Sequence, residues 1–238
     1  MGENMSAITG ILNNNNSVIP TEFKEILEDT LSVFPSDNIH YWCSNKIFIG
    51  CHMQWITTES INEKVPYYYS EWGLAITADA IIDNRKELLD LLHVQVHLRN
   101  SITDSQLILL GYQKWGEEVS KHLVGDFAFV IWDEKNQKLF ASRDFSGSRT
   151  LYYNLKNNMF SFCTIMQPLL RLPYMDHSIN EDWLAQYIAI SSVIDVVDTS
   201  STIFKDIQQL PPSHNLTFHN NKLTLNRYSN LYDLKKRN

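Results

Sequence analysis

The chain has 238 residues, of which 44% are hydrophobic and 12% aromatic, and its formal net charge is −7. This composition predicts one large globular domain with a substantial core, and the acidic balance without a Lys/Arg cluster predicts no nucleic-acid partner. The sequence has no apolar run of membrane-spanning length and no secretory signal at its N-terminus, so we expect a cytoplasmic protein with no membrane association.

The first half of the chain is predicted to alternate strands and helices. Residues 6–12 form a short apolar strand, and Thr21 is the expected N-cap of an amphipathic helix. Asn84 and Asp104 are the expected N-caps of two further helices, the second of which ends at Gly116. Further strands are expected at residues 40–44, 46–55, 67–69 and 72–79.

The stretch from Gly125 to Tyr153 is the most informative part of the sequence. Apolar side chains fill every position from 127 to 132, which predicts a strand buried on both faces. A polar turn at 135–137 leads into a second strand, which ends at Arg143-Asp144. We interpret the Arg143-Asp144 pair as structural, capping backbone groups and holding a loop that bends at Gly147.

The remaining elements continue the hairpin pattern. Residues 151–155 and 159–163 are expected to pair across Asn157-Asn158, Asn180 is a helix cap, and a last hairpin turns at Asn220-Asn221. Strands in hairpin order, with helices in small groups, predict an α+β fold.

The cysteines do not indicate a disulfide framework or a metal site. Cys43, Cys51 and Cys163 cannot form a closed set of disulfides and are not spaced like metal ligands. We expect three buried free thiols and no metal in this chain.

The order Gly-Asp-Phe-Ala-Phe, Arg-Asp, Gly and Leu-Tyr-Tyr within residues 125–153 resembles the N-terminal glutaminase domain of glutamine-dependent asparagine synthetases. β-Lactam synthetases and lasso-peptide cyclases contain the same type of domain. The resemblance implies the four-layer αββα sandwich of the N-terminal-nucleophile hydrolases. It assigns residues 1–228 to this domain and residues 229–238 to a linker or tail toward an ATP-dependent synthetase domain.

The resemblance also indicates where glutamine would be hydrolysed. The family opens with Met-Cys-Gly-Ile, and the cysteine, as the first residue of the mature chain, is the nucleophile. The matching stretch here starts Met5-Ser6-Ala7-Ile8, so Ser6 occupies the nucleophile position and five residues precede it. A serine hydroxyl is a poorer nucleophile than a thiol, and Ser6 has no free amine without processing.

The substrate-binding positions differ from the family pattern as well. The glutamine-binding arginine corresponds to Met53, beside His52. The oxyanion motif Asn-Gly-Glu corresponds to Asp79, Ala80 and Ile81, which replaces an amide donor with a carboxylate and removes the acid that would receive the substrate ammonium.

Asp104 alone matches a substrate contact of the family, in Thr103-Asp104-Ser105-Gln106. The simpler interpretation is that Asp104 is a helix N-cap, which needs no substrate. Site residues carried over from the family are therefore Ser6, Met53, Asp79, Ala80, Ile81 and, as a remnant, Asp104.

These differences favour a degenerate amidotransferase domain that has lost glutaminase activity and has a structural or docking role in an amide-forming ligase. Its partner would be a C-terminal synthetase domain or a separate ligase subunit, and ATP and Mg²⁺ are expected only there. Two alternatives stay open: an active hydrolase that uses Ser6 after N-terminal processing, and a free-standing binding or regulatory module. A homodimer is also compatible with the sequence.

Overall fold

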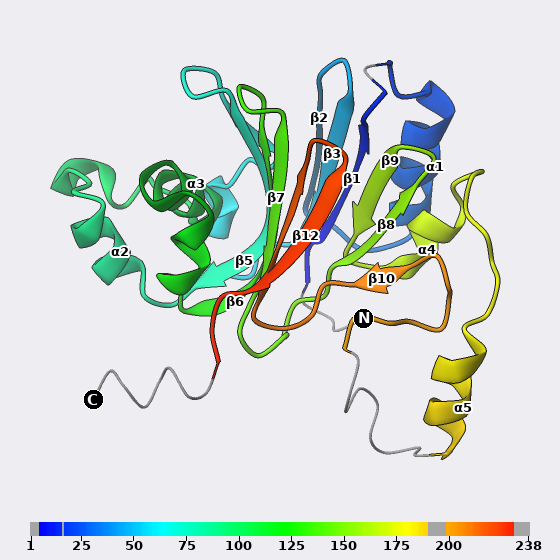
Figure 1. Cartoon of the computed structure of the whole chain (residues 1–238). Coiled ribbons are helices and arrows are strands. Elements are labelled where there is room, and N and C mark those ends of the chain that lie inside the picture. Colours follow the sequence, from blue (N-terminus) through cyan, green and yellow to red (C-terminus); the bar gives the residue numbers. More distant parts are fainter. Residues whose placement is uncertain (1–4, 16, 190–198, 231–238) are drawn as a thin grey trace.

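Two antiparallel sheets of six strands each pack face to face at the centre of the protein (Figure 1). The computed structural model describes residues 5–15, 17–189 and 199–230. In spatial order, the first sheet contains β10 (Gln208–Gln209), β8 (Tyr152–Lys156), β9 (Met159–Cys163), β1 (Ala7–Asn13), β3 (Ile47–Met53) and β2 (Asn38–Cys43). The second contains β12 (Lys222–Arg227), β11 (His214–His219), β7 (Lys138–Arg143), β6 (Gly125–Asp133), β5 (Leu74–Ile82) and β4 (Tyr67–Tyr69).

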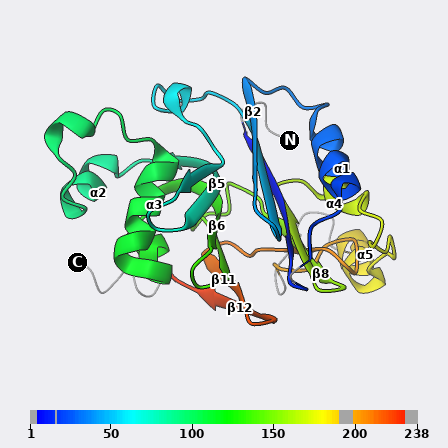
Figure 2. The ribbon, with the colours of Figure 1, turned by 90° about the horizontal axis from the view of Figure 1, so that it is seen from above.

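Helices cover the outer face of each sheet (Figure 2). α1 (Thr21–Leu31) and α4 (Met166–Leu170) pack on the first sheet. On the second sheet lie α2 (Arg85–Leu91), α3 (Asp104–Trp115) and the 3-10 helix η3 (Gly116–Lys121). The order helix, sheet, sheet, helix is the predicted four-layer αββα sandwich, which is therefore confirmed.

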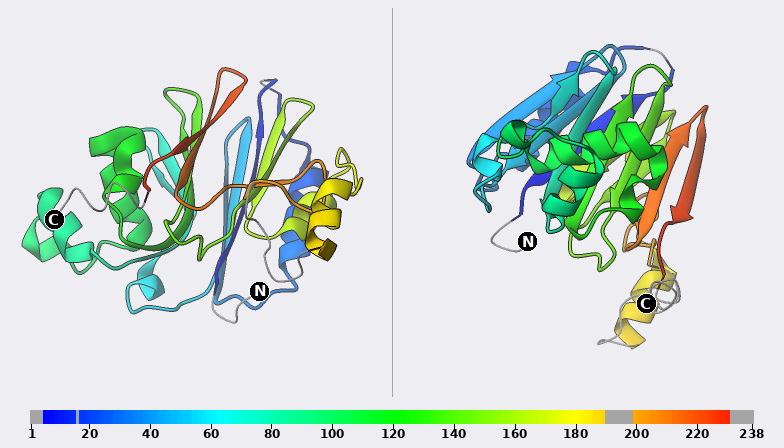
Figure 3. Two further views of the ribbon diagram at one scale, coloured as in Figure 1. Left: turned by 60° about the horizontal axis from the view of Figure 1, so that its bottom comes forward. Right: turned by 90° about the vertical axis from the view of Figure 1, so that its left-hand side faces the viewer.

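Three short or peripheral elements lie outside this scheme: the 3-10 helices η1 (Ser60–Asn62) and η2 (Val96–Leu98), and α5 (Glu181–Ala189). No residue of α5 is buried, and the helix stands clear of both sheets (Figure 3). Within the described part of the chain, every helix is too short or too polar to cross a bilayer.

The β6–β7 hairpin divides its side chains between two cores, as predicted. Phe127, Phe129 and Ile131 pack against the helices, whereas Val130 and Trp132 lie between the sheets. Because a strand with two buried faces must be apolar at every position, the continuous apolar run identified this central strand correctly.

Asparagine residues form the tight turns of two predicted hairpins. Asn157-Asn158 joins β8 to β9 and Asn220-Asn221 joins β11 to β12, and all four residues have positive φ between 50° and 62°. Asparagine tolerates this backbone region better than other residues with a β-carbon, so the sequence located both turns.

Two predictions about α1 and β2 are wrong. Pro20, not Thr21, is at the N-cap of α1, and it makes no side-chain cap hydrogen bond because proline has no polar side chain. Cys43 is exposed because it ends the edge strand β2, whereas Cys51 and Cys163 are buried as expected. Residues 231–238 of the predicted linker lie outside the described residues.

Candidate functional site

Ser6 directly precedes β1, next to the end of β3 in the first sheet and to β5 in the second sheet. Its side chain and backbone are 6% exposed. The Ser6 N–H donates to Asp79 Oδ1 at 3.3 Å, and the Ser6 Oγ accepts from the backbone N–H of Gln54 at 3.0 Å. The structure therefore brings together Ser6 and Asp79, two of the residues that the resemblance singles out, and adds Gln54, which the sequence analysis did not single out.

Asp79 is a buried carboxylate on β5, opposite Ala128 of β6. It is 2% exposed, and its Oδ2 lies 3.5 Å from Nη1 of Arg149 without a hydrogen-bond partner. Burial raises the pKa of Asp79 to about 7, although Arg149 and the Ser6 N–H oppose this shift. Glu63 and Asp126 add further negative charge nearby and raise the pKa more.

The loop after β7 places Arg149 at this carboxylate. Asp144 accepts hydrogen bonds from the N–H groups of Ser148 and Arg149, both at 2.9 Å. Arg143 donates to the carbonyls of Gly147 and Leu210, both at 2.7 Å. The Arg143-Asp144 pair therefore holds a loop, as interpreted from the sequence. Arg149 itself was missed, although it follows Arg143 by six residues in the most informative stretch.

Neither Met53, which the resemblance aligns with the glutamine-binding arginine, nor the adjacent His52 offers a positive charge. The Met53 side chain lies in the core between the sheets. His52 is buried, its Nε2 lies 2.6 Å from the Tyr41 hydroxyl, and burial lowers its pKa. A neutral imidazole cannot hold a carboxylate as an arginine fork does.

A buried thiol lies close to Asp79 but is not activated. Cys51 Sγ is 4.0 Å from the carbonyl oxygen of Ala78, and burial raises the pKa of the thiol well above its ordinary value. Because the thiolate is the nucleophilic form, Cys51 has the environment of an inert structural cysteine.

Ala80 and Ile81 follow Asp79 on β5, opposite Phe127 and Asp126 of β6, and both are half-buried. A second buried carboxylate, that of Glu63, lies near Asp79. Glu63, after η1, is buried and accepts from the Ser105 N–H at 2.8 Å, and burial raises its pKa. The sequence analysis gave no role to Glu63, because its proximity arises only through tertiary packing.

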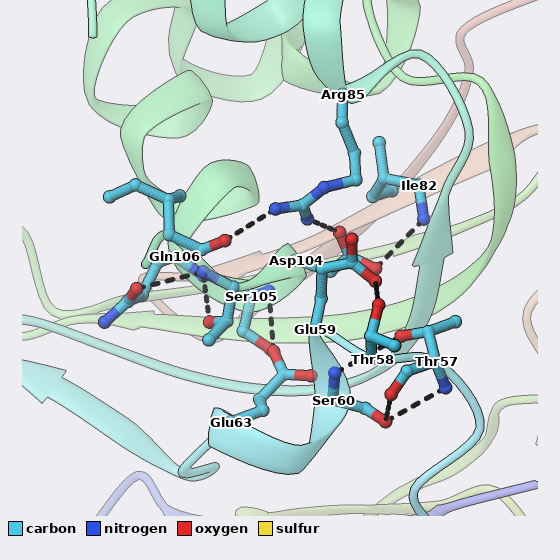
Figure 4. Close-up of polar contacts among 12 residues, drawn as sticks. Thr57, Thr58, Glu59, Ser60, Glu63, Ile82, Arg85, Asp104, Ser105 and Gln106 are labelled. Carbon is cyan, nitrogen blue, oxygen red and sulfur yellow. Dashed lines mark hydrogen bonds and ion pairs between the residues drawn. The ribbon is translucent and has the colours of Figure 1, made fainter. Parts of the chain in front are cut away.

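Both carboxylate oxygens of Asp104 have partners in the chain itself (Figure 4). Its Oδ2 accepts from the Ile82 N–H at 3.2 Å, and its Oδ1 pairs with Arg85. Arg85 also donates to the carbonyl of Ile102 at 2.6 Å. The Arg85 guanidinium therefore forms an ion pair with Asp104, the one carboxylate that matches a substrate contact of the family.

The prediction that Asp104 is the helix N-cap is wrong. Thr103 is the N-cap of α3, because its extended backbone lets it form a reciprocal capping box with Gln106. Asp104 is one residue inside the helix, and Figure 4 shows it between Arg85 and Ile82.

Comparison with known proteins gives the same family as the motif resemblance. A family model described as a glutamine amidotransferase domain matches residues 5–229. Asparagine synthetase [glutamine-hydrolyzing] 3 of Bacillus subtilis is 27% identical over 207 residues, which cover 86% of this chain and 33% of that protein. Amidase chry2 of Gibberella zeae is 31% identical over 114 residues, or 48% of this chain and 16% of that protein. The chain thus spans a third or less of the length of these relatives.

Solved structures agree on the fold. The glutamine phosphoribosylpyrophosphate amidotransferase of B. subtilis has a TM-score of 0.64 and 11% identity, and the match covers 94% of this chain and 49% of that one. An allosteric regulatory enzyme of purine biosynthesis has a TM-score of 0.56 and 13% identity, with coverage of 95% and 44%. The chain belongs to the glutamine amidotransferase domain family and is related to asparagine synthetases.

Proposed function

We propose that this domain does not hydrolyse glutamine, and that it is a structural and docking part of an ATP-dependent amide-forming ligase of the asparagine synthetase type. The observation that carries the proposal is the 3.3 Å contact from the Ser6 nitrogen to Asp79 Oδ1, since the resemblance assigns Asp79 to the position of the oxyanion donor. Amide hydrolysis develops negative charge on the attacked carbonyl oxygen. The Asp79 oxygen there accepts a hydrogen bond rather than donating one, and its ionised form, present above a pKa of about 7, repels that charge. Loss of one neutral donor alone typically costs roughly 100- to 1000-fold in rate.

The nucleophile position supports the same proposal. Activation of a serine hydroxyl requires a base that removes its proton. The Ser6 Oγ instead accepts a hydrogen bond from the Gln54 N–H, and the Ser6 nitrogen is a backbone amide that donates to Asp79. An amide nitrogen is not a base, so this arrangement lacks the free α-amine that the family chemistry uses.

The groups that would hold glutamine are also changed. Met53 is packed in the core, His52 is neutral, and Asp104 is paired with Arg85. A zwitterionic amino acid would therefore meet no available cation for its carboxylate at the family's arginine position.

The family fold is retained over residues 5–229, and this supports a docking role for the domain. Asparagine synthetase 3 of B. subtilis is about three times as long as its matched region, which leaves room in that protein for a synthetase part. We propose that a synthetase domain or subunit, with its ATP and Mg²⁺, is the partner of this domain, and that both are cytoplasmic. Family members that use an internal amine rather than ammonia have no need of glutamine hydrolysis.

A glutaminase assay on the purified 238-residue chain tests the catalytic half of the proposal. We expect the wild type and Ser6→Ala to release equal, background amounts of glutamate, with the full-length B. subtilis asparagine synthetase 3 as the positive control. Turnover by the wild type that Ser6→Ala abolishes would overturn the proposal. Intact mass spectrometry is the companion measurement, because a mature chain that begins at Ser6 would favour the alternative of a serine hydrolase.

A further inference from the structure

A cavity of about 600 Å³ lies at the end of the second sheet, and its walls do not include Ser6, Gln54 or Asp79. Segments distant in sequence form its walls: the end of β5, the start of β6, the loop after β7 and the segment after β12. The side chains that matter most are Asp83, Val124, Asp126, Phe145 and Tyr228. We call this set the β6 cavity.

The β6 cavity exposes apolar surface that the fold does not cover. Val124 is 57% exposed and Phe145 is 42% exposed, although both belong to loops next to buried strands. Apolar side chains gathered at a hollow, rather than scattered singly, are typical of a binding site.

The charge of the β6 cavity is negative. Among the described residues, neither Asp83 nor Asp126 has an ion-pair partner, whereas the lysine in the wall, Lys121, pairs with Glu118. Two unpaired carboxylates beside aromatic rings favour a positively charged group, through ion pairing and through the faces of the rings.

Hydrogen bonds fix the walls of the cavity before any partner binds. The Tyr228 hydroxyl donates to the Arg143 carbonyl at 2.9 Å, and the Asp83 N–H donates to the Val124 carbonyl at 2.8 Å. The Asp144 N–H donates to the Phe127 carbonyl at 2.8 Å. A preformed site loses less conformational entropy on binding than a site that must be ordered.

The cavity also lies where an attached domain would start. The matched family region ends at residue 229, and Ser229 is itself a wall residue. In a protein organised like the longer relatives, a following segment therefore starts at the rim of the cavity, which raises its effective concentration there.

We infer that the β6 cavity is the docking site for a segment of the synthetase part of the ligase that carries a lysine or arginine next to an apolar side chain. This inference rests on the proposed docking function and names the surface that performs it. The apolar side chain contacts Phe145 and Val124, and the cation lies between Asp83 and Asp126.

Binding of the separately expressed synthetase part to the 238-residue chain tests the inference. Phe145→Ser removes the exposed ring, and the double variant Asp83→Asn/Asp126→Asn removes the negative charge. We expect each variant to raise the dissociation constant by about tenfold or more. Raising the salt concentration should weaken wild-type binding and have little effect on the double variant.

The matched control is Val96→Ser, which alters an exposed apolar residue on η2 outside the cavity. We expect this control to change the dissociation constant by less than about twofold. Thermal unfolding of each variant should match the wild type, since the altered side chains are at least partly exposed.

Two results separate the inference from the proposed function. If the wild type binds the synthetase part and the cavity variants bind equally well, the docking site is wrong while the docking function stands. If the wild type does not bind at all, the docking function itself fails. A dimer of the 238-residue chain that Phe145→Ser dissociates would mean that a second copy fills the cavity, which also overturns the inference.

Discussion

Asp79 shows at the scale of a single residue how burial and charge oppose each other in this site. The Asp79 carboxyl group is shielded from water, and Arg149 offsets its negative charge only in part, because Nη1 of Arg149 lies 3.5 Å from Oδ2 of Asp79. Its raised pKa is the direct consequence, because desolvation disfavours the charged form. The sequence analysis singled out Asp79, but only the structure shows which groups surround it.

We predict that Asp79 makes the protein less stable as the pH rises. The ordinary pKa of this carboxyl is 3.8 and the folded value is about 7, so between these values the folded state holds a proton that the unfolded chain has released. The free energy of unfolding therefore falls with rising pH in this window, by at most about 1.4 kcal/mol per pH unit for this group.

Urea unfolding at several pH values between about 4.5 and 8 measures this slope, and Asp79→Asn should reduce it. Glu63 and Asp104, whose pKa values are also raised by burial, give a slope of the same sign in both proteins. Arg149 and Asp126 are the other charged groups near Asp79, and they are unchanged in the variant. Equal slopes for wild type and variant would contradict the assignment to Asp79.

Arg143 is predicted to be a stability residue rather than a surface charge. Its buried guanidinium donates to the carbonyls of Gly147 and Leu210. Arg143→Ala leaves those acceptors without partners and should destabilise the protein by about 3–5 kcal/mol. The control is Arg99→Ala, which removes a partly exposed pair with Asp90 and should cost less than about 1 kcal/mol. Chemical denaturation of both variants provides the comparison, and similar losses would show that the loop does not depend on Arg143.

At the scale of elements, local sequence signals succeeded where the cause is local and failed where packing decides. The hairpins at Asn157-Asn158 and Asn220-Asn221 were predictable because those residues accept positive φ. The start of α3 was assigned one residue late, since a threonine and an aspartate next to each other are both good caps. Backbone geometry and the reciprocal bond with Gln106 select Thr103.

The capping box gives a prediction for α3. Thr103→Ala removes the side-chain acceptor of the Gln106 N–H and should destabilise the protein by about 1 kcal/mol. Thr21→Ala is the control, because Thr21 is the first residue of α1 and makes no cap hydrogen bond. Its expected cost is within about 0.5 kcal/mol. Thermal unfolding midpoints distinguish the two, and an equal shift would mean that the box adds no stability.

At the scale of the whole molecule, aromatic side chains from both sheets form one core. Phe160 of β9 stacks on Phe218 of β11 with centroids 5.4 Å apart and planes inclined by 15°. This contact joins the two sheets, so their stabilities should be coupled.

We predict that Phe218→Ala destabilises the protein by about 3–5 kcal/mol, through lost burial and the cavity that remains. Hydrogen exchange should show that amides of both sheets lose protection together. Leu223→Ala, at a partly buried position on the edge strand β12, is the control and should have the smaller effect. Loss of protection confined to the second sheet would show that the two sheets unfold separately.

The sequence by itself determined the family, the α+β class and the buried hairpin, because each is encoded by consecutive residues. Local periodicity and turn chemistry require no knowledge of distant contacts. The tertiary structure alone decided that Gln54 and Arg149 lie at Ser6 and Asp79, that Arg85 occupies Asp104, and that Glu63 lies beside them. These neighbours come from separate strands and loops. Their proximity follows from the packing of the layers, and local sequence patterns do not predict that packing.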